Sequence, residues 1–299
     1  MTALKATKPE NKEKRLKMLV FGPPGVGKTT ATLQFPSSYI IDTEHGTDFY
    51  AETINKAGSV VLNTLDVDDI KDELRALLTE KHAYKTLIID PITQVYSFTQ
   101  EKWTKIFEKY AKNDKEAEVG DFGMRYWSKV KSDFKSMQRL MLALDMNVIV
   151  TSHQKDVYGT GFSKIGVTFD SMKGDDYLFD LVFRVERRGG SLIAFKIKER
   201  SEIGKAKFPD EFEWSYSNFV NYYGKEIVER EAKPIIFANS AQIVQLKDLI
   251  EALNISQDQQ DKVLKQFDAD KFEDLTEDQC QKVIDSLQKK IKALAKEKK

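Results

Sequence analysis

The sequence predicts an α/β protein with a mostly parallel β-sheet covered by helices, a β-hairpin extension and a small C-terminal helical module. Three observations favour this fold. Between Leu16 and about Ile203, short apolar runs alternate with helical patterns, as in proteins built on parallel sheets. From Tyr177 onward, two β-rich runs flank the turn sequence RRGG. After about residue 240, the pattern is helical and contains no strand.

Five apolar runs are the expected strands of the sheet. They are LKMLVF (16–21), SYIIDT (38–43), SVVLN (59–63), TLIID (86–90) and NVIVTS (147–152). One expected helix is DVDDIKDELRALLTE (66–80). Another contains apolar residues that recur every three or four positions, namely Trp127, Val130, Phe134, Met137, Met141 and Leu144. The two runs around RRGG (177–200) form a hairpin that extends the sheet at one end.

These patterns divide the chain into four parts. Residues 1–15 form a basic, flexible tail, residues 16–232 the α/β core, residues 233–240 a linker, and residues 241–299 a helical module. Two apolar stripes mark helices of the module; one runs from Ile243 to Leu253 and the other from Cys280 to Leu294. SQDQ (256–259) and TEDQ (276–279) are typical of capping boxes, with Ser256 and Thr276 as the caps.

Composition excludes several classes of protein. The 47 basic residues balance the 47 acidic ones, so any nucleic-acid binding must come from a local patch. The single cysteine, Cys280, cannot form an internal disulfide or a cysteine-rich zinc site. No apolar run approaches the length of a membrane span, and the polar start lacks the apolar stretch of a signal peptide. A reducing, cytoplasmic setting and no membrane partner are the simplest expectation.

GPPGVGKTT (22–30) fits the phosphate-loop pattern G-x-x-x-x-G-K-[ST], with an apolar strand before it and a helix after it. Glycines let the backbone curl so that several N–H groups point at phosphate oxygens, and the helix N-terminus adds a favourable dipole. Lys28 is expected to meet the β- and γ-phosphates, and Thr29 to offer its hydroxyl to Mg²⁺. The cofactors are therefore ATP and Mg²⁺. The expected nucleotide contacts are Gly22, Pro23, Pro24, Gly25, Val26, Gly27, Lys28, Thr29 and Thr30.

Three further strand ends carry polar residues. Asp90 ends TLIID, and in this class such an acid holds the magnesium shell. Glu44 follows the strand IIDT and is expected to polarise the attacking water, because ends of parallel strands in one sheet face the same crevice. His153 ends the last strand and is the expected γ-phosphate sensor; Gln154 should point the opposite way.

Two alternatives for IIDTEHG are a metal site and a turn. A metal site would need Asp42, Glu44 and His45 to converge, but successive residues of a strand point to opposite faces. We therefore interpret the segment as part of an active site and as neither alternative.

LVFGPPGVGKTT, FPSSYIIDTEHG, TLIIDPIT, GDFGMRYWSKV and VIVTSH together resemble the RecA-type recombinase ATPases, and more closely the compact phage-encoded nucleotide-binding recombinases of the Sak group. The resemblance covers about 16–200 and weakens toward 232. It implies a RecA-like P-loop core, an ATPase stimulated by DNA, and a role in DNA recombination, repair or single-strand annealing in the cytoplasm of a bacterial host. The sequence departs from the family at His153, where RecA-type proteins usually have glutamine, and in beginning its first strand near Leu16.

The resemblance also implies partners. It implies a homo-oligomeric ring or filament with ATP at subunit interfaces, where Lys198 and Arg200 of FKIKER would reach a neighbour's ATP. It makes the segment 154–176 a mobile DNA-binding loop. Basic and aromatic side chains there suit single-stranded DNA, and they are Lys155, Tyr158, Phe162, Lys164 and Lys173. The stretch 111–125 is a candidate companion loop.

Two other functions remain open. One is an ATP-gated adaptor or loader whose helical module recruits a single-strand-binding or replication protein. The other is a small-molecule kinase with the same phosphate loop, although the sequence has no arginine-rich lid. DFG (121–123) does not indicate a protein kinase, because no H-R-D loop precedes it and the phosphate loop carries the lysine.

Overall fold

The computed structural model describes residues 15–111, 119–200, 204–234, 236–267 and 269–297. The chain divides into two compact units. The first contains Met1–Leu65, Ala83–Ser97 and Met146–Ala232, and the second contains Asp66–His82, Phe98–Asp145 and Lys233–Lys299. The predicted flexible tail lies outside the described residues except for Arg15, which is buried and donates hydrogen bonds to the carbonyl oxygens of Arg230 and Glu231.

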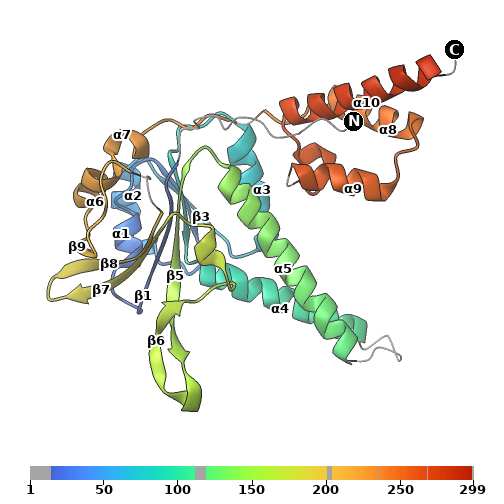
Figure 1. Cartoon of the computed structure of the whole chain (residues 1–299). Coiled ribbons are helices and arrows are strands. Elements are labelled where there is room, and N and C mark those ends of the chain that lie inside the picture. The colour runs from blue at the N-terminus through green and yellow to red at the C-terminus, as the bar shows by residue number, and fades with distance from the viewer. Residues whose placement is uncertain (1–14, 112–118, 201–203, 235, 268, 298–299) are drawn as a thin grey trace. The chain divides into compact units, whose positions relative to one another are not determined.

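The first unit is built on a β-sheet (Figure 1), in which the described residues form nine strands in the order β3-β2-β4-β5-β1-β7-β8-β9, with β6 paired to β5. The strands are β1 (Lys17–Gly22), β2 (Ser38–Asp42), β3 (Val60–Asn63), β4 (Thr86–Asp90), β5 (Asn147–Tyr158), β6 (Lys164–Phe169), β7 (Leu181–Arg188), β8 (Ser191–Glu199) and β9 (Glu211–Glu213). Neighbours from β3 to β7 are parallel, and the hairpin β7–β8 is antiparallel. The predicted fold class is therefore confirmed.

Helices of the first unit are α1 (Lys28–Thr32), α2 (Ala51–Lys56), α6 (Tyr216–Tyr223) and α7 (Lys225–Val228), with short turns η1 (Asp48–Tyr50), η2 (Thr160–Phe162) and η3 (Asp175–Tyr177). Helix α1 rests on a cluster of aromatic side chains. Phe183 of β7 contacts Phe208, Phe212, Trp214 and Phe219, with ring centroids 5.2–6.5 Å apart. The indole N–H of Trp214 donates to the carbonyl of Ala31 at 3.2 Å. This buried cluster fixes the helix that follows the phosphate loop.

β1 and β7 approach each other unusually closely at Gly22. A Cβ atom added there would lie 2.3 Å from the carbonyl oxygen of Val185, whereas Gly22 itself has no positive φ angle. The glycine is thus required at the end of β1 by packing, in addition to the curling of the loop that the sequence suggested. It lets β7 lie directly beside the phosphate loop.

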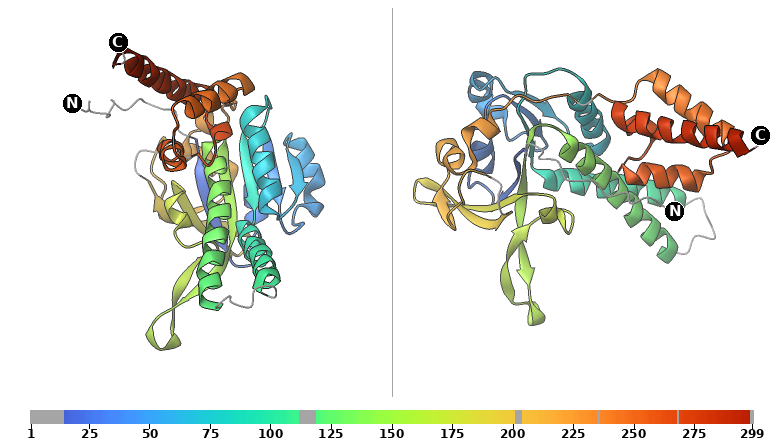
Figure 2. Two further views of the ribbon diagram at one scale, coloured as in Figure 1. Left: turned by 90° about the vertical axis from the view of Figure 1, so that its right-hand side faces the viewer. Right: turned by 45° about the horizontal axis from the view of Figure 1, so that its top comes forward.

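The prediction that residues 154–176 form a mobile loop is wrong for most of the segment. β5 continues to Tyr158 and pairs antiparallel with β6, from Gln154↔Phe169 to Tyr158↔Lys164, so the segment is a hairpin arm that projects from the sheet (Figures 1 and 2). The glycines of the segment favour a loop, but they are compatible with a tight turn between two strands. Gly159 and Gly161 lie at the tip of the arm. Val157 belongs to the strand before the tip and Val167 to the strand after it.

In the second unit, α3 (Val67–Thr79), most of α4 (Ile92–Ala111) and α5 (Val119–Ala143) precede the C-terminal helices α8 (Ser240–Ala252), α9 (Gln257–Gln266) and α10 (Glu277–Glu297), with η4 (Phe272–Asp274) between the last two. The C-terminal helices share a core that includes Leu246, Leu275 and Ile284. The predicted caps are confirmed, because Ser256 forms a capping box and Thr276 exchanges hydrogen bonds with Gln279.

The candidate companion loop 111–125 is in part a helix, because α5 begins at Val119; residues 112–118 lie outside the described residues. Across the part of the chain that is described, no helix is both long and apolar enough to cross a membrane.

Candidate active site

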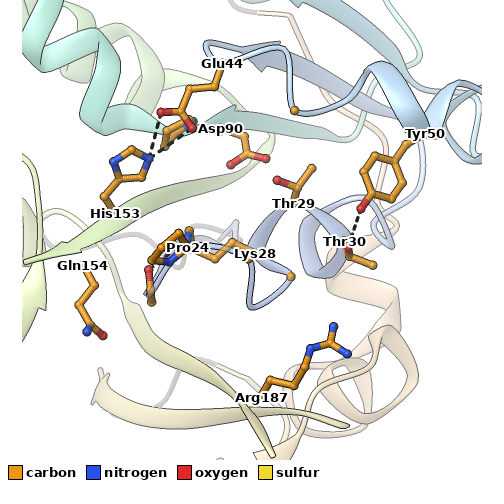
Figure 3. Close-up of a pocket in the computed structure, with 15 residues that line it drawn as sticks. Pro24, Lys28, Thr29, Thr30, Glu44, Tyr50, Asp90, His153, Gln154 and Arg187 are labelled. Atoms are coloured by element: carbon orange, nitrogen blue, oxygen red, sulfur yellow. Dashed lines mark hydrogen bonds and ion pairs between the residues drawn. The ribbon is translucent and has the colours of Figure 1, made fainter. Parts of the chain in front are cut away.

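A cavity of about 480 Å³ opens where β1, β2 and β4 end and where β5 passes through His153 and Gln154 (Figure 3). Carboxyl ends of parallel strands are the usual place for a ligand in such sheets. The side chains and glycines that line the cavity are Gly22, Pro24, Gly25, Gly27, Lys28, Thr29, Thr30, Glu44, Gly46, Tyr50, Asp90, Pro91, His153, Gln154 and Arg187. The sequence-predicted residues Lys28, Thr29, Glu44, Asp90 and His153 thus meet at one place. Of the expected loop contacts, Pro23 and Val26 do not line the cavity.

The phosphate loop adopts the curled backbone that its glycines permit. Gly25 and Gly27 have φ angles of 71° and 106°, a region that favours glycine. The Lys28 ammonium donates to the carbonyl oxygens of Gly22 (3.0 Å) and Pro23 (2.9 Å), which keeps the cation inside the loop. Burial lowers the pKa of Lys28, although Asp90 and Glu44 nearby act in the opposite direction.

Asp90 is buried at the end of β4, and the Thr151 hydroxyl donates to its carboxylate. Burial raises the pKa of Asp90, against the effect of the hydrogen bonds from Thr151 and Thr29. The Thr29 hydroxyl and the Asp90 carboxylate therefore lie together at the cavity. Both are hard oxygen donors, which suits Mg²⁺. When bound, Mg²⁺ would neutralise developing charge on the phosphates.

Asp42 organises a turn, so the exclusion of a turn at IIDTEHG is wrong. Its carboxylate accepts hydrogen bonds from the backbone N–H groups of Glu44 (3.1 Å), Gly46 (3.1 Å) and Thr47 (2.8 Å), and from the Thr47 hydroxyl (2.5 Å). His45 has a φ angle of 57°, which this turn requires. The segment is thus a turn that presents Glu44 to the cavity, and this gives His45 a backbone role. Burial would raise the pKa of Asp42, but these hydrogen bonds outweigh it and hold the pKa below its ordinary value.

Replacing Asp42 with Asn is expected to lower the free energy of unfolding at pH 7 by about 1–3 kcal/mol, because an amide nitrogen would face donors. The folded-state pKa of Asp42 is depressed, so its contribution is full above its ordinary pKa of 3.8 and is lost as pH falls through the folded-state value. The difference in the free energy of unfolding between wild type and Asp42→Asn, measured with urea, should therefore be smaller at about pH 3 than at pH 7. Asp48→Asn, an exposed change in the same segment, is the control. An equal deficit at both pH values would contradict this role.

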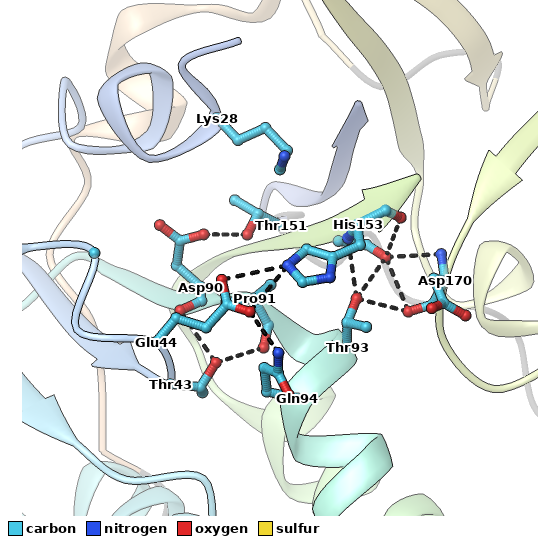
Figure 4. A network of polar contacts seen from close by, with 12 residues as sticks. Lys28, Thr43, Glu44, Asp90, Pro91, Thr93, Gln94, Thr151, His153 and Asp170 are labelled. Atoms are coloured by element: carbon cyan, nitrogen blue, oxygen red, sulfur yellow. Dashed lines mark hydrogen bonds and ion pairs between the residues drawn. The ribbon is translucent and has the colours of Figure 1, made fainter. Parts of the chain in front are cut away.

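Glu44 and His153 contact each other at the edge of the cavity (Figure 4). His153 Nε2 lies 3.0 Å from Glu44 Oε1, and the Gln94 amide donates to the same carboxylate at 2.5 Å. The backbone N–H of His153 donates to the Thr93 hydroxyl at 3.0 Å. These contacts hold the Glu44 carboxylate at the cavity wall while leaving it 38% exposed, as a group that must reach a water molecule needs to be.

Gln154 lines the cavity together with His153, and its side chain is directed away from the His153 ring (Figure 3), as is expected of successive residues in a strand. β5 pairs with β1 as far as Gly22↔His153 and with β6 from Gln154 onward. The strand leaves the main sheet between these residues and continues as the first strand of the arm.

The lining residues Gly46, Tyr50, Pro91 and Arg187 were not predicted, and of these Tyr50 and Arg187 bring polar side chains to the cavity. The hydroxyl oxygens of Tyr50 and Thr30 lie 3.1 Å apart, and Arg187 reaches the cavity from β7. Arg187 follows the buried Phe183 and Val185 at every second position, and this pattern in the sequence indicates that the three side chains share one face of the strand. Its nearness to the phosphate loop, however, depends on β7 lying beside β1.

The other predicted site residues lie outside the cavity. Lys198 donates to the carbonyl of Asp176 at 2.6 Å, and Arg200 pairs with Asp180 at 3.0 Å. Burial lowers the pKa of Lys198, and the neighbouring Arg200 lowers it further. A role for either residue in a neighbouring subunit stays a prediction.

The predicted DNA contacts lie on or beside the arm. Lys155 pairs with Asp170 at 3.0 Å and Lys164 with Asp156 at 2.7 Å. Tyr158 and Phe162 are 60% and 92% exposed near the arm tip. Lys173 is exposed in the turn after β6.

Comparison with known proteins gives one family. A family model described as an AAA domain matches residues 14–203, which is more than half of the chain. A search of curated proteins gives no match. The matched region includes the phosphate loop, Glu44, Asp90 and His153, whose side chains line one cavity. The chain therefore belongs to the AAA domain family and is a nucleotide-binding P-loop ATPase.

Proposed function

We propose that this protein is a DNA-stimulated ATPase that uses ATP with Mg²⁺ and acts on single-stranded DNA in recombination or strand annealing. The observation that carries the proposal is the continuity of β5. The strand passes His153 and Gln154 at the nucleotide cavity and runs without interruption into the exposed arm. A change at the γ-phosphate thus has a covalent and hydrogen-bonded route to the arm.

Hydrogen bonds at the base of the arm reinforce this route (Figure 4). The Thr93 hydroxyl accepts from the backbone of His153 and donates to the carbonyl of Asp170 at 2.7 Å. The backbone N–H of Asp170 donates to the carbonyl of His153 at 2.8 Å. His153 in turn contacts Glu44. Glu44, which we propose acts on the attacking water, is therefore joined through His153 to Asp170, the first residue after β6.

The arm suits base stacking better than phosphate neutralisation. Lys155 and Lys164 each have an acidic partner on the arm or at its base, whereas the rings of Tyr158 and Phe162 are exposed. Exposed aromatic rings bind successive bases of single strands without sequence preference. DNA binding through this arm should then depend on salt only weakly, because few phosphates are neutralised by free cations.

The resemblance to RecA-type ATPases supports an assembled form, a ring or filament. In such an assembly, Lys198 and Arg200 would reach the nucleotide of a neighbouring subunit and stabilise the charge that develops there. Neither residue lines the cavity of its own chain.

The test is ATP turnover with and without a thymidine oligonucleotide, together with DNA binding at two salt concentrations. We expect single-stranded DNA to raise the rate of phosphate release. If DNA does not change the rate of phosphate release and does not bind saturably, the proposed function is wrong. Phosphoryl transfer to a small acceptor in place of water would support a kinase.

Replacing Phe162 with Ala is expected to lower the affinity for the oligonucleotide by about 1–3 kcal/mol, the contribution of one stacked base. Lys164→Ala should have a smaller effect, because Lys164 is paired with Asp156. Fluorescence anisotropy with labelled oligonucleotide measures both. Ile197→Ala, an exposed apolar change on β8, is the matched control. A larger loss from Lys164→Ala than from Phe162→Ala would show that phosphate contacts dominate.

A further inference from the structure

Arg187 is a cation at the nucleotide cavity that the phosphate-loop pattern does not include. A Cβ atom added to Gly27 would lie 3.5 Å from Nη2 of Arg187, so the guanidinium lies against the loop (Figure 3). Among the described residues, no hydrogen bond or ion pair to the Arg187 side chain is found, although it lines the cavity. An exposed guanidinium beside a phosphate-binding loop is suited to an anionic ligand.

The strand pattern explains why Arg187 differs from the other arginines of β7. Residues 183, 185 and 187 share one face, and Phe183 and Val185 are fully buried there. Arg184 and Arg188 lie on the opposite face, where both stack on the ring of Phe195.

Acidic partners complete this arrangement on the opposite face. Arg184 and Arg188 both pair with Glu186, and Arg188 also pairs with Glu211. Arg184 and Arg188 therefore have their partners within the hairpin, whereas Arg187 points toward the phosphate loop.

The position of Arg187 along the cavity identifies the part of the nucleotide that it meets. The Cβ position at Gly27 that is close to Arg187 also lies 3.9 Å from the Thr30 hydroxyl, which is in contact with Tyr50. Glu44, His153 and Asp90 form the other end of the cavity (Figure 3). That end carries the residues expected to meet the γ-phosphate and Mg²⁺, so the end with Thr30 and Arg187 is left for the α-phosphate and the nucleoside.

We propose that Arg187 binds the α-phosphate of the nucleotide held by its own chain and sets the affinity for ATP and ADP alike. A planar guanidinium can donate two parallel hydrogen bonds to phosphate oxygens. Arg187 lies away from the end of the cavity where the γ-phosphate would be cleaved. Its contact should therefore affect nucleotide binding and not the chemical step. The inference rests on nucleotide binding by the AAA domain and does not depend on DNA.

The experiment compares Arg187→Ala with Arg188→Ala in the full chain. Kd values for ATP, ADP, AMP and adenosine are measured by isothermal titration with Mg²⁺, and KM and kcat by phosphate release. Arg187→Ala should raise Kd for ATP and ADP by about tenfold or more, the effect of one charge-assisted contact, and should raise KM in step. Arg188→Ala, which removes a neighbouring cation with partners on the other face, should leave these Kd values near wild type.

Several results would overturn the proposal. If adenosine loses as much affinity as ATP, Arg187 contacts the nucleoside and not the phosphate. If kcat falls while Kd for ATP is unchanged, Arg187 acts in hydrolysis. If Arg188→Ala raises Kd equally, the effect is one of general charge. Arg187→Lys separates fork geometry from charge, because lysine keeps the charge and should recover only part of the ATP affinity. Failure of DNA to stimulate turnover would leave these Kd results unaffected and would bear only on the proposed function.

Discussion

Replacing Glu44 with Gln is expected to leave the Kd for ATP within about twofold while lowering kcat by about 10²–10⁴-fold, the usual effect of removing a general base. Gln has nearly the shape of Glu and can still accept a hydrogen bond from Gln94 or His153, so the turn and the cavity should persist. It cannot, however, take a proton from the attacking water. Loss of the chemical step with retained binding is therefore the expected result.

The measurement is phosphate release at saturating ATP and Mg²⁺, paired with a direct Kd from a fluorescent nucleotide. Glu52→Gln is the matched control, because Glu52 is an exposed glutamate in the first turn of α2 and does not line the cavity. Undiminished turnover in Glu44→Gln would remove Glu44 from the reaction. A loss of ATP binding of the same size as the loss of turnover would show that its charge serves the bound state instead.

Replacing Gly22 with Ala is expected to lower the free energy of unfolding by about 3 kcal/mol, at the upper end of overpacking effects, and to remove most nucleotide binding. The new Cβ would lie 2.3 Å from the Val185 carbonyl oxygen, and a backbone atom cannot move aside as a flexible side chain can. β7 would have to separate from β1. That movement would shift the phosphate loop and carry Arg187 away from Gly27.

Thermal and urea unfolding measure the first effect, and ATP titration the second. Gly166→Ala is the control, since Gly166 has an ordinary φ angle and its added Cβ would meet no atom within 4 Å. Wild-type stability and ATP binding in Gly22→Ala would mean that β7 does not press on the end of β1 as the structure has it.

Local sequence was sufficient for most strands and for the caps of the helical module. TLIID matches β4 residue for residue, and β1 differs from LKMLVF by a shift of one position. Buried parallel strands are continuous apolar runs, and such runs are visible without any knowledge of their neighbours. The arm is not predicted by local sequence, because Gly159 and Gly161 favour a loop, whereas the pairing of β5 with β6 depends on residues on both sides of the tip.

The sequence by itself determined the phosphate loop and the convergence of Lys28, Glu44, Asp90 and His153, because ends of parallel strands in one sheet must face one edge. Only the tertiary structure decided that Arg187 meets the same cavity and that Asp42 builds the turn that holds Glu44. The physical reason is the order of the strands. β7 comes far later in the chain than β1, yet lies beside it, and no local pattern encodes which distant strand completes a row of backbone hydrogen bonds.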